Sequence, residues 1–207
     1  KDRPKEFENY LKVGLETSQF AFDDRAKDKN RGKHIGQIFT SKGCVARCTF
    51  CQRSTKGYKV QPLEHLENHL KYLKENFDVG FIQILDENFG SNKKQAYQVA
   101  DILHKNGLIW FADGVRCTST TREDIQYYKE RGCSTLRYGV ESGSQKILDL
   151  MEKIFTVDDI YSALTACIEK GINAPLAIML GMPGENESTA KATGKFLGTI
   201  AAKLGVH

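Results

Sequence analysis

The sequence lacks any long uncharged apolar run, although 40% of its 207 residues are hydrophobic. No stretch approaches the roughly 20 apolar residues that a membrane-spanning helix needs, and residues 1–6 are charged, unlike a signal peptide. The apolar content excludes a disordered chain and fits one or at most two globular domains. These features predict a soluble intracellular protein of the cytoplasm, with no membrane partner.

Strong charge of one sign and a disulfide-like cysteine density are also missing. Lys and Arg number 30 against 26 Asp and Glu, and the resulting net charge of +4 is too small to indicate nucleic-acid binding. Basic clusters at 25–33 and 53–59 lack the aromatic-rich pattern that stacks on bases, so no nucleic-acid partner is expected. The six cysteines are too sparse for a disulfide scaffold, but three lie within eight residues, which indicates a metal site.

The sequence alternates short apolar runs with amphipathic stretches. The runs predict buried strands at 34–40, 80–85, 108–112, 135–140 and 174–180. Helices are expected to begin near Pro62, after the N-cap residues Ser91, Thr121 and Thr156, and at about residue 186. Parallel strands joined by helices form either a barrel or a doubly wound sheet, and both place the loops after the strands at one edge.

The loop after the first predicted strand carries Cys44, Cys48 and Cys51 in a C-x3-C-x2-C pattern. Thiolates in this arrangement suit zinc, copper(I) or an iron–sulfur cluster, and a closed site would need a fourth ligand. The remaining cysteines, Cys117, Cys133 and Cys167, are scattered along the chain. Three ligands would leave one iron of a [4Fe–4S] cluster open.

This loop, with the aromatic Phe50 just before its third cysteine, resembles the cluster-binding loop of the radical S-adenosylmethionine (SAM) superfamily. The resemblance implies an α/β fold, a partial parallel (βα) barrel of five to six βα units. It also implies a [4Fe–4S] cluster on Cys44, Cys48 and Cys51, with SAM on the open iron and Phe50 beside the cofactor. A zinc site or a non-catalytic iron–sulfur electron-transfer module is the alternative.

Other strand ends extend the resemblance. Asp86 or Glu87, after the second strand, would accept hydrogen bonds from the ammonium group of SAM, and which of them does so is left open. Arg116, after the third strand, would contact SAM or a substrate anion, or form an ordinary salt bridge. Glu141 and Ser142 lie in a segment like the family's Gly-x-Glu-Ser-Gly motif, which implies that Glu141 binds the ribose hydroxyls.

The last matching loop, residues 179–185, contains Leu180 and is similar to the loop that lines the adenine pocket in the family. Lys153 continues the resemblance without a role that can be assigned. The resemblance, which spans about residues 35–199, implies an enzyme that reductively cleaves SAM to a 5′-deoxyadenosyl radical for hydrogen abstraction from an unknown substrate. Its catalytic residues are not predicted, and an electron donor such as flavodoxin or ferredoxin is implied.

The branch and the domain organisation follow from the same comparison. The Asp86-Glu87-Asn88-Phe89 sequence resembles an Asp-Asp-x-Phe variant, which favours a cobalamin-linked or methylthiotransferase-like branch and cobalamin in a domain outside this chain. Residues 1–33 are interpreted as a polar lead-in or linker, and residues 34–207 as the core domain. Because the family barrel usually has six strands, we expect the core to be truncated at its C-terminal end. A further domain or subunit would then cover the open edge.

Overall fold

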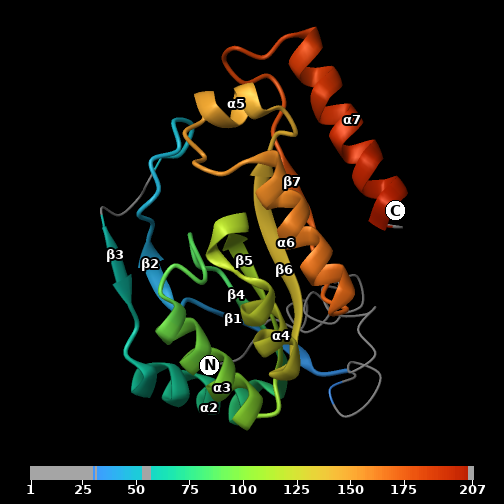
Figure 1. Cartoon of the computed structure of the whole chain (residues 1–207). Coiled ribbons are helices and arrows are strands. Elements are labelled where there is room, and N and C mark those ends of the chain that lie inside the picture. Colours follow the sequence, from blue (N-terminus) through green and yellow to red (C-terminus); the bar gives the residue numbers. More distant parts are fainter. Residues whose placement is uncertain (1–29, 31, 53–56, 205–207) are drawn as a thin grey trace, which may run out of the picture.

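The computed structural model describes residues 30, 32–52 and 57–204, and the predicted lead-in at 1–33 lies largely outside them. Five parallel strands form one sheet in the order β1-β4-β5-β6-β7 (Figure 1). The strands are β1 (His34–Ile38), β4 (Val79–Ile84), β5 (Ile109–Val115), β6 (Cys133–Glu141) and β7 (Leu176–Ile178). All five predicted strands are confirmed, with ends that differ by a few residues.

Helices connect the strands and cover one face of the sheet (Figure 1). They are α2 (Leu63–Phe77), α3 (Lys93–Lys105), the 3-10 turn η3 (Cys117–Ser119), α4 (Arg122–Glu130), α5 (Gln145–Leu150), α6 (Val157–Glu169) and α7 (Glu187–Leu204). Capping boxes at Thr121 and Thr156 begin α4 and α6 as predicted. The Ser91 prediction was wrong, because the Asn92 side chain accepts the hydrogen bond from the Gln95 backbone and so caps α3.

Two features were not predicted from the sequence. Strands β2 (Ser41–Gly43) and β3 (Tyr58–Val60) form an antiparallel pair on either side of the cysteine segment. The short helix α5 follows β6 directly. Both features lie beside the cysteine segment. The end of α5 contacts this segment directly, because the Thr49 backbone donates a hydrogen bond to the carbonyl of Met151.

The main hydrophobic core lies between the sheet and the helices. It includes Ile82, Trp110 and Leu136, which are fully buried on the three central strands. A smaller apolar cluster, formed by Phe81, Ile109 and Phe111 with Ile35 packed against it, lies on the other face. Successive side chains of a strand point to opposite faces of the sheet. Strands β4 and β5 place apolar residues on both faces, which is typical of a sheet that is covered on both sides.

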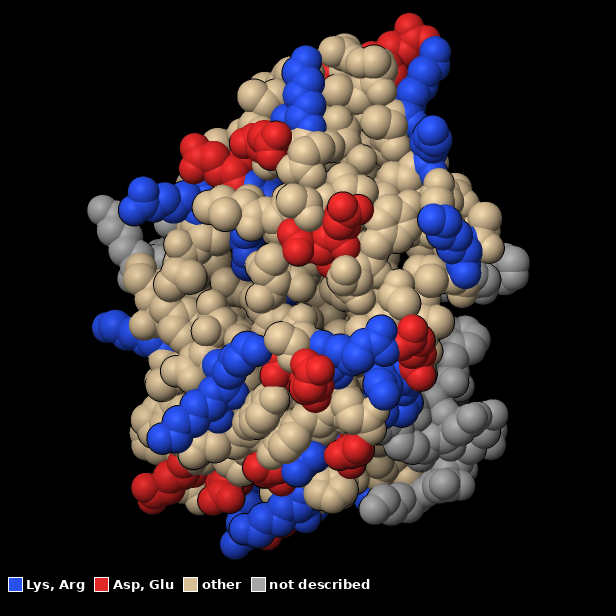
Figure 2. Space-filling view, in the orientation of Figure 1, with Lys and Arg blue, Asp and Glu red and all other residues tan. Residues whose placement is uncertain are grey.

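Acidic and basic side chains are interspersed on the face that Figure 2 shows, rather than gathered by sign. This mixture agrees with the small net charge of +4. Within the described residues, no helix has the length and apolar character that a membrane span requires.

Candidate active site

Asp86 holds the start of the cysteine segment against β4. Its Oδ1 accepts hydrogen bonds from the backbone N–H groups of Thr40 (2.7 Å) and Ser41 (3.1 Å), and its Oδ2 accepts from their hydroxyls (2.5 and 2.6 Å). The side chain is buried, and all four bonds go to protein donors. Of the two acidic residues at this strand end, Asp86 is buried and Glu87 is exposed.

Further contacts fix the two ends of the cysteine segment. The carbonyl of Thr40 accepts hydrogen bonds from the Gln95 side chain (2.5 Å) and the Gln61 backbone (2.8 Å). Beyond the second cysteine, Thr49 donates to the carbonyls of Met151 (3.0 Å) and Leu150 (3.1 Å), near the end of α5. One end of the segment is thus held by residues that follow β3 and β4, and the other end by the end of α5, which follows β6.

None of the three loop cysteines is in a disulfide; Cys44 and Cys48 are half-buried and Cys51 is exposed. Within the described part of the chain, no three His, Cys, Asp or Glu side chains are close enough together to hold a metal ion. The donor set still fits a [4Fe–4S] cluster, because three soft thiol ligands lie on one short segment held at both ends.

Two other cysteines do not have the properties of a fourth ligand. Burial raises the pKa of the Cys117 thiol to about 12, and it raises the pKa of the Cys167 thiol to about 11. Because the thiolate is the form that binds metal, these groups favour the neutral thiol of an ordinary buried side chain. In this structure Cys117 and Cys167 are therefore ordinary buried side chains.

Arg116 lies where β5 ends and reaches the cysteine segment. Its Nη1 is 3.5 Å from the Cys48 sulfur, and its Nη2 donates a hydrogen bond to the Lys153 carbonyl. The guanidinium also lies 5.4 Å from the centre of the Phe155 ring. The structure thus brings the predicted arginine to the predicted cysteines, although they are far apart in the sequence.

A buried ion pair lies behind the same segment. Glu141 ends β6, and its Oε1 is 3.2 Å from Nζ of Lys153, with side-chain exposures of 11% and 5%. The ammonium of Lys153 also faces the rings of Phe50 (5.6 Å) and Phe155 (5.2 Å). A Cβ at Gly139 would be 2.8 Å from Glu141 Oε1, so glycine makes room for the pair.

The sequence did not predict that Lys153 pairs with Glu141. The family-like spacing around Lys153 drew attention to this residue, but spacing does not indicate that its side chain is buried. A buried ammonium requires a nearby opposite charge, and only the fold supplies it. Glu141 also has a φ of +68°, a left-handed conformation that is uncommon for glutamate and is often found at functional sites.

The two remaining predicted residues differ in exposure. The buried Ser142 hydroxyl is 3.1 Å from the Thr193 hydroxyl on α7 and accepts a hydrogen bond from the Ser144 backbone (3.1 Å). These bonds hold the turn between β6 and α5. Leu180 lies on the loop after β7 and is 78% exposed, so its side chain is available to line a ligand pocket.

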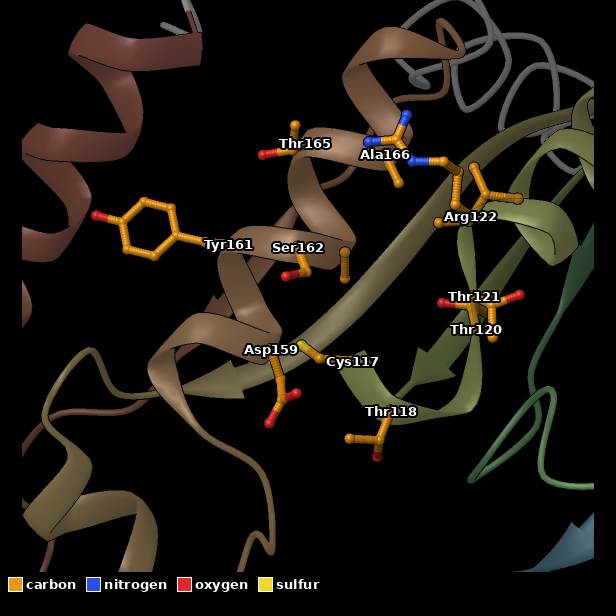
Figure 3. A pocket seen from close by; sticks show the side chains of 12 residues that line it. Cys117, Thr118, Thr120, Thr121, Arg122, Asp159, Tyr161, Ser162, Thr165 and Ala166 are labelled. Atoms are coloured by element: carbon orange, nitrogen blue, oxygen red, sulfur yellow. The ribbon is translucent and has the colours of Figure 1, made fainter.

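A cavity of about 610 Å³ lies elsewhere, between the η3–α4 turn and α6 (Figure 3). Its lining includes Cys117, Thr121 and Asp159, but not Glu141 or the loop cysteines. Thr121 and Asp159 already take part in the capping boxes of α4 and α6. The cavity is therefore separate from the candidate site.

A family model described as the Radical SAM superfamily matches residues 38–197. The chain belongs to the radical SAM superfamily, whose members are enzymes that use a [4Fe–4S] cluster and SAM.

Individual relatives agree with this family. An uncharacterised methyltransferase of Pyrococcus horikoshii is 30% identical over 175 residues, which cover 82% of this chain and 38% of the relative. A cytidylyl-2-hydroxyethylphosphonate methyltransferase of Streptomyces wedmorensis is 24% identical and matches 73% of this chain and 29% of its own length. This chain thus spans well under half of these relatives.

The fold is also shared with solved structures. The radical SAM methyltransferase TsrM from Kitasatospora setae, with cobalamin and a [4Fe–4S] cluster bound, superimposes with a TM-score of 0.72 at 19% identity. The match covers 81% of this chain and 35% of TsrM. The predicted α/β fold of the partial-barrel radical SAM type is confirmed.

Proposed function

We propose that this protein is a radical SAM enzyme whose cluster is held by Cys44, Cys48 and Cys51 and whose SAM binds the open iron. The observation that carries the proposal is the convergence of Arg116 and the Glu141–Lys153 pair on the cysteine segment. The Cys48 sulfur is 3.5 Å from Nη1 of Arg116, and the ring of Phe50 faces the ammonium of Lys153. Both signs of charge that a zwitterionic ligand needs are therefore present near the cysteine segment.

The chemistry that such a cluster supplies when bound is one electron, which breaks the sulfonium C5′–S bond of SAM to give methionine and a 5′-deoxyadenosyl radical. The residues of the chain bind and orient the SAM molecule. Arg116 and Lys153 are the cations that we assign to its carboxylate, and the exposed Glu87 is the acceptor that we assign to its ammonium. Asp86 positions the cysteine segment instead, because its oxygens are already bonded to Thr40 and Ser41.

The nucleoside end of SAM would lie toward β6 and β7. Oε1 of Glu141 is in the ion pair, and we assign Oε2 to the ribose hydroxyls. Leu180 and Phe50 supply apolar walls that exclude water from the reacting atoms. Ser142 supports Glu141 by holding the turn that follows it.

The partners are proposals of the same kind. A radical SAM enzyme needs a substrate and a reductant, and we propose a flavodoxin or ferredoxin as the electron donor. The methyltransferase relatives and the cobalamin bound to TsrM support a transferase that uses cobalamin held outside the described residues. A further domain or subunit at the open edge of the sheet would complete the substrate site.

A non-catalytic iron–sulfur module would need the cysteines but not Arg116, Glu141 or Lys153, and the enzymatic relatives do not support it. The test is conversion of SAM into 5′-deoxyadenosine by anaerobically reconstituted protein with dithionite. We expect the product from the native protein and from Cys167→Ala, whose cysteine is a buried core residue. A protein with Cys44, Cys48 and Cys51 all replaced by Ala should hold no cluster; a full cluster in that variant would refute the assignment.

A further inference from the structure

The inner face of the sheet, opposite the helices, carries polar side chains near the candidate site. Ile82 and Leu136 belong to the core beneath the helices. Gln83 and Arg137, the next residues on the same strands, therefore point to the inner face. Arg137 is exposed, which shows that this part of the inner face is accessible to a ligand.

Four side chains from four strands form a continuous polar band on this face. Nε2 of Gln37 donates to Oε1 of Gln83 (2.9 Å), and Nε2 of Gln83 donates to Oδ2 of Asp113 (2.6 Å). Nη1 of Arg137 lies 2.9 Å from Oδ1 of Asp113. We call Gln37, Gln83, Asp113 and Arg137 the polar band.

The band lies between an apolar layer and the candidate site. Two residues before Asp113 on β5 is Phe111, a member of the small apolar cluster, and its ring lies 5.9 Å from the Arg137 guanidinium. Toward the carboxyl end of β6, Arg137 is followed on the same face by Gly139 and Glu141. Four residues of strand place Arg137 and Glu141 roughly 13 Å apart along the backbone. A small molecule held by the band would therefore reach a nucleoside bound at Glu141.

Arg137 is the group in the band that is best suited to bind a ligand. Its side chain is 45% exposed, while that of its partner Asp113 is 17% exposed. The contact between them is ionic and lacks the geometry of a hydrogen bond, since the buried Oδ1 has no hydrogen-bond donor in the described part of the chain. Because the arginine side of the pair is exposed and makes no hydrogen bond to Asp113, the guanidinium is able to turn toward a ligand at low cost.

We propose that the polar band recognises the substrate and that Arg137 binds a carboxylate group of it. The guanidinium matches a planar carboxylate with two parallel hydrogen bonds. Asp113 cancels the charge of Arg137, so the band suits a singly charged carboxylate better than a doubly charged phosphate. The inference rests on the proposed function, because SAM at Glu141 is what makes this face a substrate site.

The test uses three probes of equal length: pentanoate, pentanamide and pentylamine. Binding to the reconstituted protein with SAM is measured by ligand-observed NMR titration. We expect pentanoate to bind best, its affinity to fall about tenfold or more in Arg137→Gln, and Arg137→Lys to restore part of the loss. Asp113→Asn removes the competing carboxylate and keeps an oxygen for Gln83, so it should raise pentanoate affinity severalfold.

The matched control is Arg122→Gln, which removes an arginine of similar exposure that pairs with Glu169 outside the barrel. Pentanoate binding should be unchanged in this variant. Equal binding of the three probes would overturn the inference. So would a pentanoate affinity that is the same in the native protein and in the Arg137 and Asp113 variants. Wild-type protein that cleaves SAM but binds none of the probes would overturn the inference and leave the proposed function standing. Arg137-dependent binding without SAM cleavage would refute the proposed function; Arg137 would still bind a carboxylate, but the band would no longer be a substrate site.

Discussion

At the scale of single residues, we expect the Glu141–Lys153 pair to contribute to stability as well as to SAM binding. Both side chains are almost fully buried, so each charge depends on the other for compensation. Arg116 donates to the carbonyl of Lys153, which links the pair to the cysteine segment. A change at either member is therefore expected to affect folding as well as SAM binding.

We expect Glu141→Gln and Lys153→Met each to lower the free energy of unfolding by about 3–5 kcal/mol, because each leaves a buried charge without its partner. The double variant should lose much less than the sum, since it leaves no unpaired charge. Urea unfolding of the four proteins gives this double-mutant cycle. Strictly additive losses would contradict the coupling.

Motifs in the sequence indicated part of this candidate site. The cysteines, Arg116 and Glu141 were proposed because each follows a strand in a recognisable pattern, and their roles stay predictions. The four bonds of Asp86 were not predictable, because its partners Thr40 and Ser41 come from a strand end about 45 residues earlier. A carboxylate at a strand end has the same sequence signal whether it binds a ligand or the protein.

At the scale of secondary-structure elements, Asp86 joins β4 to the segment between β1 and β2. Asp86→Ala would leave two backbone N–H groups and two hydroxyls without acceptors, at a cost of about 1–3 kcal/mol for each buried group that water does not reach. We expect lower iron content after reconstitution. Asp86→Asn should recover most of it, because the hydroxyls of Thr40 and Ser41 are able to rotate and accept from the amide. Normal iron content in Asp86→Ala would show that the clamp does not position the cysteines.

A second prediction concerns the N-terminus of α4, where Asp124 completes the capping box. Burial acts to raise the pKa of this carboxyl, but hydrogen bonds from Lys93 and Tyr97 outweigh it, so the pKa lies below the usual 3.8. The lowered pKa stabilises the fold above about pH 4, and this contribution is lost as the pH falls through the folded-state pKa. The unfolding free-energy difference between the native protein and Asp124→Asn should therefore shrink between about pH 5 and pH 2. A difference that stays constant over this range would contradict the lowered pKa.

The elements differ in how well the sequence predicted them. The predicted starts of α4 and α6 were correct, because a capping box is local and all its partners lie within three residues. The three-residue strands β2 and β3 were missed because their pairing joins distant segments and their length gives no clear alternation. The cap of α3 moved from Ser91 to Asn92, since both residue types are good caps and only the backbone conformation selects between them.

At the scale of the whole molecule, the sequential strand order gathers every predicted site loop at one edge of the sheet. Right-handed crossovers between parallel strands produce this arrangement, which is why the grouping of these loops could be predicted from the sequence before their contacts were known. The outer strand β7 has only three residues, and these are not fully buried. A partner domain at this strand remains a proposal, in agreement with the small share of its relatives that the chain spans.

Hydrogen–deuterium exchange tests where SAM binds across the whole fold. In reconstituted protein, we expect SAM to slow exchange in the backbone of residues 44–51, 141–144 and 179–184, because the proposed ligand contacts all three loops. The last turns of α2 and α3, at 70–77 and 99–105, lead to the amino ends of β4 and β5 and should be unaffected; they serve as the internal control. Protection confined to residues 118–122 and 159–166 would instead place SAM in the cavity between the η3–α4 turn and α6. That result would separate SAM from the cysteines and refute the proposed site, since a ligand of iron must lie beside them.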